Sequence, residues 1–192
     1  FQDIYSIYIQ DLRKKRVRLL EVENGCGSSA LWRDLLPNLR SVYLEFNEIC
    51  AEGMSPKADW LIYGNQNQLK PNKMVATLGP YDVIVDHGGR MPRQQISSLL
   101  SLWPTLRNNG IYAIENNPPK TSYVDNSMRE LMTNLIVSLQ NPSHSFTSIS
   151  NNETISRIIF SISNSISSVN CYPNLCLLTK KRINYNLMNK KI

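Results

Sequence analysis

The feature that most constrains this chain is an alternation of short apolar runs with helical patterns. Each run has the length, the apolar content and the β-branched or aromatic residues of a buried strand. The runs are residues 17–22, 41–46 ("SVYLEF"), 60–63, 81–86 ("YDVIVD") and 110–115 ("GIYAIE"). Nearly continuous apolar strands separated by helices are typical of a parallel sheet covered on both faces. The sequence therefore predicts a doubly wound α/β architecture.

Two helical patterns follow the fourth strand. In the first, the apolar residues are spaced as on one face of a helix: Ile96, Leu99, Leu100, Trp103 and Leu106. We expect Asn108-Asn109-Gly110 to end this helix, because Asn and Gly adopt positive φ most readily. A second helix is expected over residues 126–140.

The last third of the chain changes in composition and then becomes regular again. Residues 141–166 are rich in Ser and Asn, and we expect a loose insert that contains a poor helix. "SVNCY" and "LCLLTKK" are then separated only by Pro173-Asn174. Two strands joined by so short a connection must be antiparallel. The predicted fold is thus a Rossmann-like, mostly parallel sheet closed by an antiparallel C-terminal β-hairpin.

Charge and cysteine content say less about function. The net charge of +6 is carried partly by the runs 13–16 and 180–182. Such a run can hold phosphates, but no aromatic residue alternates with the basic ones, so we do not expect nucleic acid as a partner. The four cysteines lack zinc-site spacing. Cys171 and Cys176 flank the hairpin turn and form either a disulfide or two buried thiols; we favour the thiols.

Glycines between the first strand and the following helix indicate a ligand site. Gly25 and Gly27 allow close approach to the backbone, and Glu45 ends the second strand, where a carboxylate can accept both ribose hydroxyls. Together they suggest an adenosine-containing ligand. A structural tight turn and a dinucleotide site, with Ala30 in the third glycine position, are the alternatives.

At these residues the chain resembles the class I S-adenosylmethionine-dependent methyltransferases, and more narrowly a eukaryotic, largely fungal branch related to the macrocin-type sugar O-methyltransferases. The motif LEIG-x-G…GAS-x-x-LW of that branch corresponds to "LEVENGCGSSALW", and FDVIIDDGGH corresponds to "YDVIVDHGGR". "VYLEFNEICAEG", "QISSLLSLWPTLRNNGIYAIENN" and the C-terminal hairpin also match. The resemblance covers residues 17–123 and 167–181.

The resemblance implies a set of cofactor residues. Glu21, with the two glycines, would surround the methionine and ribose part of S-adenosyl-L-methionine. Glu45 would hold the ribose hydroxyls, and Phe46 would line the adenine. The full set is Glu21, Gly25, Gly27, Glu45, Phe46, Asn65, Gln66 and Asp86.

Several positions depart from the family pattern. His87 replaces the second acid of the fourth motif, Arg90 replaces the family histidine, and Asn116 replaces a later acid. Asp86 and Glu115 remain as magnesium ligands, so the resemblance implies a weakened Mg²⁺ site. Arg90 cannot act as a general base, which leaves His87 and Asp86 as the catalytic candidates.

The leading interpretation is an enzyme that transfers a methyl group from S-adenosyl-L-methionine to the oxygen of a small-molecule or sugar-like acceptor. The alternatives are a catalytically degenerate, cofactor-binding or interaction domain and an NAD-dependent dehydrogenase. We expect one domain over residues 1–181 and a basic tail over 182–192. Since no apolar run is long enough to span a membrane and the chain begins at Phe1, we expect a soluble protein with an incomplete N-terminus; its compartment is unknown.

Overall fold

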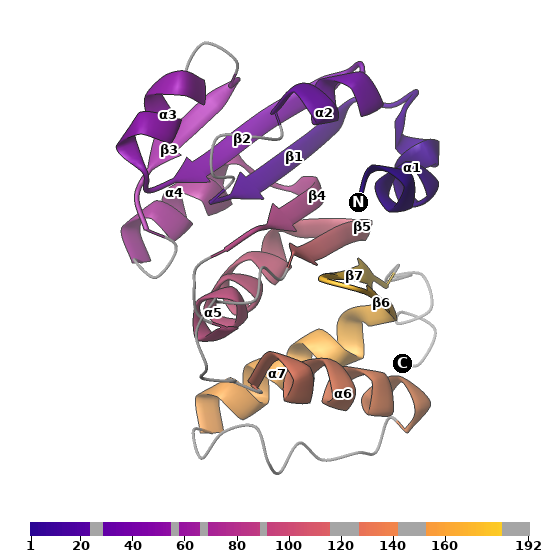
Figure 1. Ribbon diagram of the computed structural model, residues 1–192. Coiled ribbons are helices and arrows are strands. Elements are labelled where there is room, and N and C mark those ends of the chain that lie inside the picture. Colours follow the sequence, from indigo (N-terminus) through magenta and orange to yellow (C-terminus); the bar gives the residue numbers. More distant parts are fainter. Residues whose placement is uncertain are drawn as a thin grey trace, which may run out of the picture.

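The described part of the chain is built around one mixed sheet. The computed structural model describes residues 1–23, 29–54, 58–65, 69–88, 92–115, 127–141 and 153–181. The seven-stranded sheet has the order β3-β2-β1-β4-β5-β7-β6 (Figure 1). Its strands are β1 Val17–Val22, β2 Leu39–Glu45, β3 Trp60–Tyr63, β4 Tyr81–Asp86, β5 Leu106–Glu115, β6 Ile166–Tyr172 and β7 Leu175–Lys180.

The pairing of the strands agrees with the predicted topology. The pairs β1–β2, β1–β4, β2–β3 and β4–β5 are parallel, whereas β7 runs antiparallel to both β5 and β6. The predicted mostly parallel sheet with an antiparallel C-terminal hairpin is confirmed.

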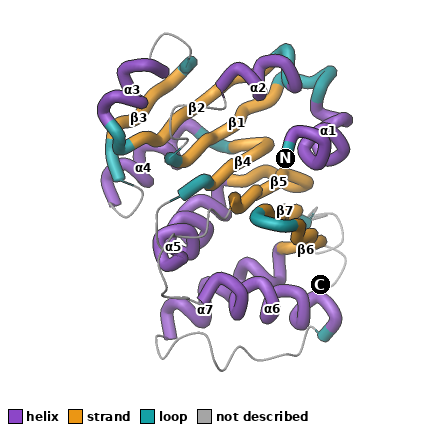
Figure 2. Tube along the Cα trace, in the orientation of Figure 1, coloured by secondary structure: helices purple, strands orange, loops and turns teal. Residues whose placement is uncertain are grey.

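Helices cover both faces of this sheet (Figure 2). On one face, side chains of α4, α5, α6 and α7 form a core with alternate strand residues such as Leu20 and Ile84. On the other face, α1 and α2 pack on the intervening residues, such as Leu19 and Val83. The described helices are α1 Gln2–Ile9, η1 Gln10–Leu12, α2 Ser29–Leu35, α3 Glu48–Met54, α4 Leu69–Leu78, α5 Pro92–Leu102, η2 Trp103–Thr105, α6 Ser127–Gln140 and α7 Glu153–Ser165. None of these helices has the length and apolarity that a membrane span requires.

Two boundaries differ from the prediction. Helix α5 ends at Leu102 and continues only as the short 3₁₀ turn η2, which contains Pro104 and leads directly into β5. Asn109, with φ 61°, therefore lies within β5 rather than at a helix end. Between residues 141 and 166 the structure has α7, whose Ile159 and Ile162 are buried in the core.

The prediction that Cys171 and Cys176 are buried thiols was wrong. The two residues form a disulfide. The register of β6 and β7 places the two residues directly opposite each other, with Cα atoms 4.1 Å apart. This register depends on how the hairpin pairs, which the spacing of the two cysteines alone does not determine. Cys50 is also disulfide-bonded.

The three tryptophans do not share one environment. Trp32 and Trp103 are 1% and 3% exposed, as expected for core residues. Trp60 is 37% exposed and is therefore not a core residue. It begins β3, which is a strand of four residues at the edge of the sheet and therefore has a neighbouring strand on one side only.

Candidate functional site

Three polar side chains lie near the carboxyl ends of neighbouring strands, on the same face of the sheet. Glu21 lies in β1, His87 directly follows β4, and Glu115 ends β5. Side chains alternate between the two faces of a strand, so a residue shares its face with the residue two positions earlier. The residues two positions earlier all pack in the core under α1 and α2; they are Leu19, Val85 and Ala113. The alternation therefore brings the side chains of Glu21, His87 and Glu115 together.

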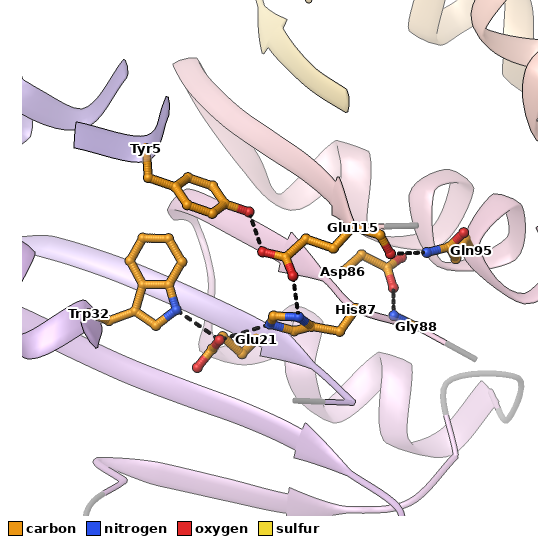
Figure 3. Close-up of polar contacts among 8 residues, drawn as sticks. All are labelled: Tyr5, Glu21, Trp32, Asp86, His87, Gly88, Gln95 and Glu115. Atoms are coloured by element: carbon orange, nitrogen blue, oxygen red, sulfur yellow. Dashed lines mark hydrogen bonds and ion pairs between the residues drawn. The ribbon is translucent and has the colours of Figure 1, made fainter. Parts of the chain in front are cut away.

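Hydrogen bonds and ion pairs connect these side chains in the Glu21–His87–Glu115 cluster (Figure 3). His87 Nε2 lies 3.0 Å from Glu21 Oε1, and His87 Nδ1 lies 2.9 Å from Glu115 Oε2. Both helices of this face contribute a donor: Tyr5 Oη donates to Glu115 Oε1 at 2.7 Å, and Trp32 Nε1 donates to Glu21 Oε1 at 2.8 Å. The rings of Tyr5 and Trp32 meet edge to face, with centroids 4.8 Å apart.

The two carboxylates determine the charge of the histidine. Burial alone would lower the pKa of His87, but the hydrogen bonds and charges of Glu115 and Glu21 outweigh it and raise the pKa to about 10. Burial would raise the pKa of Glu115, but His87 and Tyr5 lower it below its usual value. At neutral pH the imidazolium therefore donates from both ring nitrogens, so it has no lone pair with which to act as a general base.

Asp86 faces the opposite side of the sheet. Its Oδ2 accepts a hydrogen bond from Tyr112 Oη at 2.9 Å, and its Oδ1 accepts one from the Gly88 N–H at 2.8 Å. Tyr112 belongs to the core under α4 to α7, whereas Glu115 contacts Tyr5 under α1. Burial raises the pKa of Asp86 to about 7, although both hydrogen bonds oppose the shift.

The geometry around the magnesium candidates is unfavourable for a metal ion. The hydrogen bonds of Asp86 and Glu115 lie on opposite faces, and all four carboxylate oxygens accept hydrogen bonds from protein groups. A protonated His87 also places a cation beside Glu115. Within the described ranges, no group of three or more His, Cys, Asp and Glu side chains could hold a metal ion. These residues therefore do not fit Mg²⁺, which prefers an octahedral set of oxygen ligands.

The ends of β2 and β3 form a second part of the site. Glu45 is buried, and its Oε1 accepts the backbone N–H groups of Phe46 at 3.0 Å and Asn47 at 2.9 Å. The N–H of Gly64 donates to the carbonyl oxygen of Glu45 at 3.0 Å, which brings the following residue, Asn65, to the same corner. Phe46 is 49% exposed there. The other positions that the motifs single out, Gly25, Gly27, Gln66, Arg90 and Asn116, lie outside the described residues.

Both parts of the site lie at the carboxyl ends of parallel strands. The chain passes from β1 to β2 on one side, while β4 and β5 lie on the other side of β1, so the direction of winding reverses between β1 and β4. Ligands of open α/β sheets bind in the crevice at this reversal.

Sequence analysis missed Tyr5, which lies outside every motif and 110 residues from Glu115 in the chain.

Comparisons with known proteins place this geometry in context. No family model matches the sequence. The chain is 27% identical over 125 residues to 8-demethyl-8-(2-methoxy-alpha-L-rhamnosyl)-tetracenomycin-C 3'-O-methyltransferase of Streptomyces olivaceus; the match covers 60% of this chain and 32% of that protein. It is 26% identical over 125 residues to mycinamicin VI 2''-O-methyltransferase of Micromonospora griseorubida, covering 60% and 31%. The chain thus spans about a third of the length of these curated relatives.

The structural comparison extends over more of the chain. The MycE methyltransferase of mycinamycin biosynthesis, solved in complex with Mg and SAH, matches 100% of this chain and 54% of its own, with a TM-score of 0.72 and 19% sequence identity. The fold is therefore that of the class I methyltransferases.

Proposed function

We propose that this chain binds S-adenosyl-L-methionine and transfers its methyl group to an oxygen of a small, sugar-like acceptor. One observation carries the proposal: the buried carboxylates of Glu21 and Glu45 lie at the ends of adjacent parallel strands, beside the reversal of strand order. A ligand bound there meets acidic groups from two strands at once. The names of the two curated relatives support this reaction class, since both are O-methyltransferases and the first name includes a rhamnosyl group.

The described residues fit the chemistry of this cofactor. Two backbone N–H groups orient the Glu45 carboxylate, whose acceptor character suits a ribose diol. The half-exposed ring of Phe46 provides an apolar surface for an adenine beside it. Two carboxylates and one imidazolium give the Glu21–His87–Glu115 cluster a formal charge of −1, which suits a sulfonium cation. On the basis of the family motifs, we assign to Asn65 a contact with the adenine of the cofactor. Contacts with the same cofactor are assigned on that basis to Gly25, Gly27 and Gln66.

When bound, S-adenosyl-L-methionine supplies an electrophilic methyl group, so the chain mainly has to position the reactants. The family motif makes Asp86 the candidate proton acceptor; burial raises its pKa to about 7, and its two oxygens accept hydrogen bonds from Gly88 and Tyr112. We assign His87 a positioning role, since it donates to Glu21 and Glu115 and so orients both carboxylates. No step is assigned to magnesium. We further propose that residues 1–181 form a single domain and that the chain belongs to the eukaryotic, largely fungal branch.

Calorimetric titration with S-adenosyl-L-methionine and S-adenosylhomocysteine tests this proposal, with NAD as the control ligand. Replacing Glu45 by Ala should weaken binding of both by about 1–3 kcal/mol, the cost of losing a charged hydrogen-bond acceptor. Glu48→Ala, which removes an exposed carboxylate three residues away, should leave the affinity unchanged. If neither compound binds to the folded protein, or if NAD binds instead, the proposal is refuted.

A second candidate, a cofactor-binding domain without transferase activity, is favoured by one observation: His87 occupies the position of a family acid and engages both neighbouring carboxylates. Binding of S-adenosyl-L-methionine without formation of S-adenosylhomocysteine, over a panel of rhamnosides and other deoxyhexosides, would support it. Turnover on any of these acceptors would exclude it.

A further inference from the structure

A basic pocket lies at the amino ends of the strands, at the end of the sheet opposite the proposed cofactor site. It has no part in the proposed methyl transfer. The pocket has a volume of about 450 Å³ and is lined by Arg16, Val17, Arg18, Arg40, Trp60 and Arg107. These residues lie at the amino ends of β1, β2, β3 and β5. Along β1, Arg18 of the pocket lies three residues before Glu21 of the Glu21–His87–Glu115 cluster, which corresponds to about 10 Å of strand. The pocket is thus distinct from the proposed cofactor site.

The arginines of this pocket are only partly neutralised. Arg107 Nη1 donates to both carboxylate oxygens of Asp82, at 2.8 and 2.7 Å, and Arg40 Nη1 lies 3.6 Å from Asp59 Oδ1. The salt bridges between described residues do not include Arg16. The four arginines therefore exceed these two aspartates by two positive charges. Arg16 also ends an exposed basic run that begins at residue 13, which adds to the positive potential at the pocket.

Trp60 adds an aromatic surface to this positive charge. The basic run has no aromatic neighbour in the sequence, but the fold brings β3 beside β2 and β1 and so places Trp60 in the same pocket. The guanidinium carbon of Arg18 lies 5.9 Å from the centroid of the Trp60 ring. Arg18 Nη1 donates to the carbonyl oxygens of residues 78 and 79, which fixes the guanidinium near that ring. Planar guanidinium and indole groups are the side chains on which a nucleobase stacks.

We propose that this pocket binds a nucleotide, with its phosphates against the arginines and its base against Trp60. The arginines offer donors that match phosphate oxygens, and the 37% exposure of Trp60 leaves part of the indole accessible to the base. A free nucleotide and a nucleotide unit of a single-stranded nucleic acid share this chemistry.

Titration with uridine ligands tests the proposal on the whole chain. Uridine triphosphate and a uridine dodecamer avoid the adenosine chemistry proposed for the other site, and saturating S-adenosylhomocysteine blocks that site further. We expect dissociation constants of about 1–100 μM at low salt, and weaker binding as salt increases. Binding of the dodecamer at least about tenfold tighter than of the triphosphate would indicate a strand; equal affinity would indicate the free nucleotide.

Variants separate the contributions of charge and ring. Arg16→Ala combined with Arg40→Ala should weaken both ligands about tenfold or more, whereas Arg129→Ala, on the exposed side of α6, should not. Trp60→Leu should weaken the uridine ligands about tenfold without affecting tripolyphosphate, and Trp60→Phe should retain most of the affinity.

Two results would overturn the proposal. One is the absence of binding at low salt. The other is tripolyphosphate binding to the wild type as tightly as uridine triphosphate, since a stacked base should add affinity. The arginine variants and the comparison of tripolyphosphate with uridine triphosphate on the wild type keep the test valid if Trp60→Leu does not fold.

Discussion

Replacing His87 by Leu should destabilise the protein strongly, because it leaves two carboxylates without their shared cation. Glu21 is fully buried, and the Glu115 side chain is 18% exposed. Removing one partner of a buried ion pair typically costs about 3–5 kcal/mol. The pKa of His87, about 10, gives an independent figure: at about 1.4 kcal/mol per pH unit, the bound proton contributes about 4 kcal/mol at pH 7.

The same pKa predicts how this loss depends on pH. A histidine whose pKa is raised in the folded state contributes stability that is complete below its unfolded pKa of 6.5 and disappears as the pH rises through about 10. Urea unfolding of the wild type and of His87→Leu should therefore differ by about 4 kcal/mol at pH 7 and by less than about 1 kcal/mol at pH 9.5. Among the described residues, His87 contacts the carboxylates of Glu21 and Glu115, which in turn accept hydrogen bonds from Trp32 and Tyr5.

A matched variant controls for the loss of a positive charge as such. Arg33, whose side chain is 47% exposed and 3.9 Å from Asp59, forms a surface ion pair, so Arg33→Leu should change stability by less than about 1 kcal/mol. If His87→Leu unfolds within about 1 kcal/mol of the wild type at pH 7, or if the difference does not shrink by pH 9.5, the assignment of a buried imidazolium is refuted.

Three further predictions use the same unfolding measurement. Tyr5→Phe removes a hydrogen bond to the charged Glu115 and should cost about 1–3 kcal/mol; a cost near zero would mean that α1 does not depend on this contact. Asp86 has a pKa raised from 3.8 to about 7, so it contributes stability at low pH that is lost as the pH rises from about 4 to 7. Asp86→Asn should flatten that part of the pH profile, and an unchanged slope would contradict the assignment. Replacing Cys171 and Cys176 by Ser should lower the unfolding free energy by about 2 kcal/mol in the loop-entropy account, measured without reductant so that the disulfide of Cys50 stays intact; an unchanged unfolding free energy would contradict this account.

Much of the site could be derived from local periodicity. The period of two along each strand, together with a parallel sheet, places Glu21, His87 and Glu115 on one face at neighbouring strand ends. The same alternation sends Asp86 to the opposite face, which the motif comparison did not consider when it paired Asp86 with Glu115 as metal ligands. The protonation of His87 could not be derived in this way, because it depends on both carboxylates being within hydrogen-bond distance of the ring.

The sequence by itself determined the order and type of the elements, since the apolar runs, helix faces and short hairpin connection are local patterns with a fixed geometric period. Only the tertiary structure decided which distant side chains meet. Tyr5 reaches Glu115 across 110 residues, and Trp60 joins the arginines of the basic run through strand pairing rather than through sequence neighbours. The physical reason is that such contacts depend on the register and packing of whole elements, which no short stretch of sequence specifies.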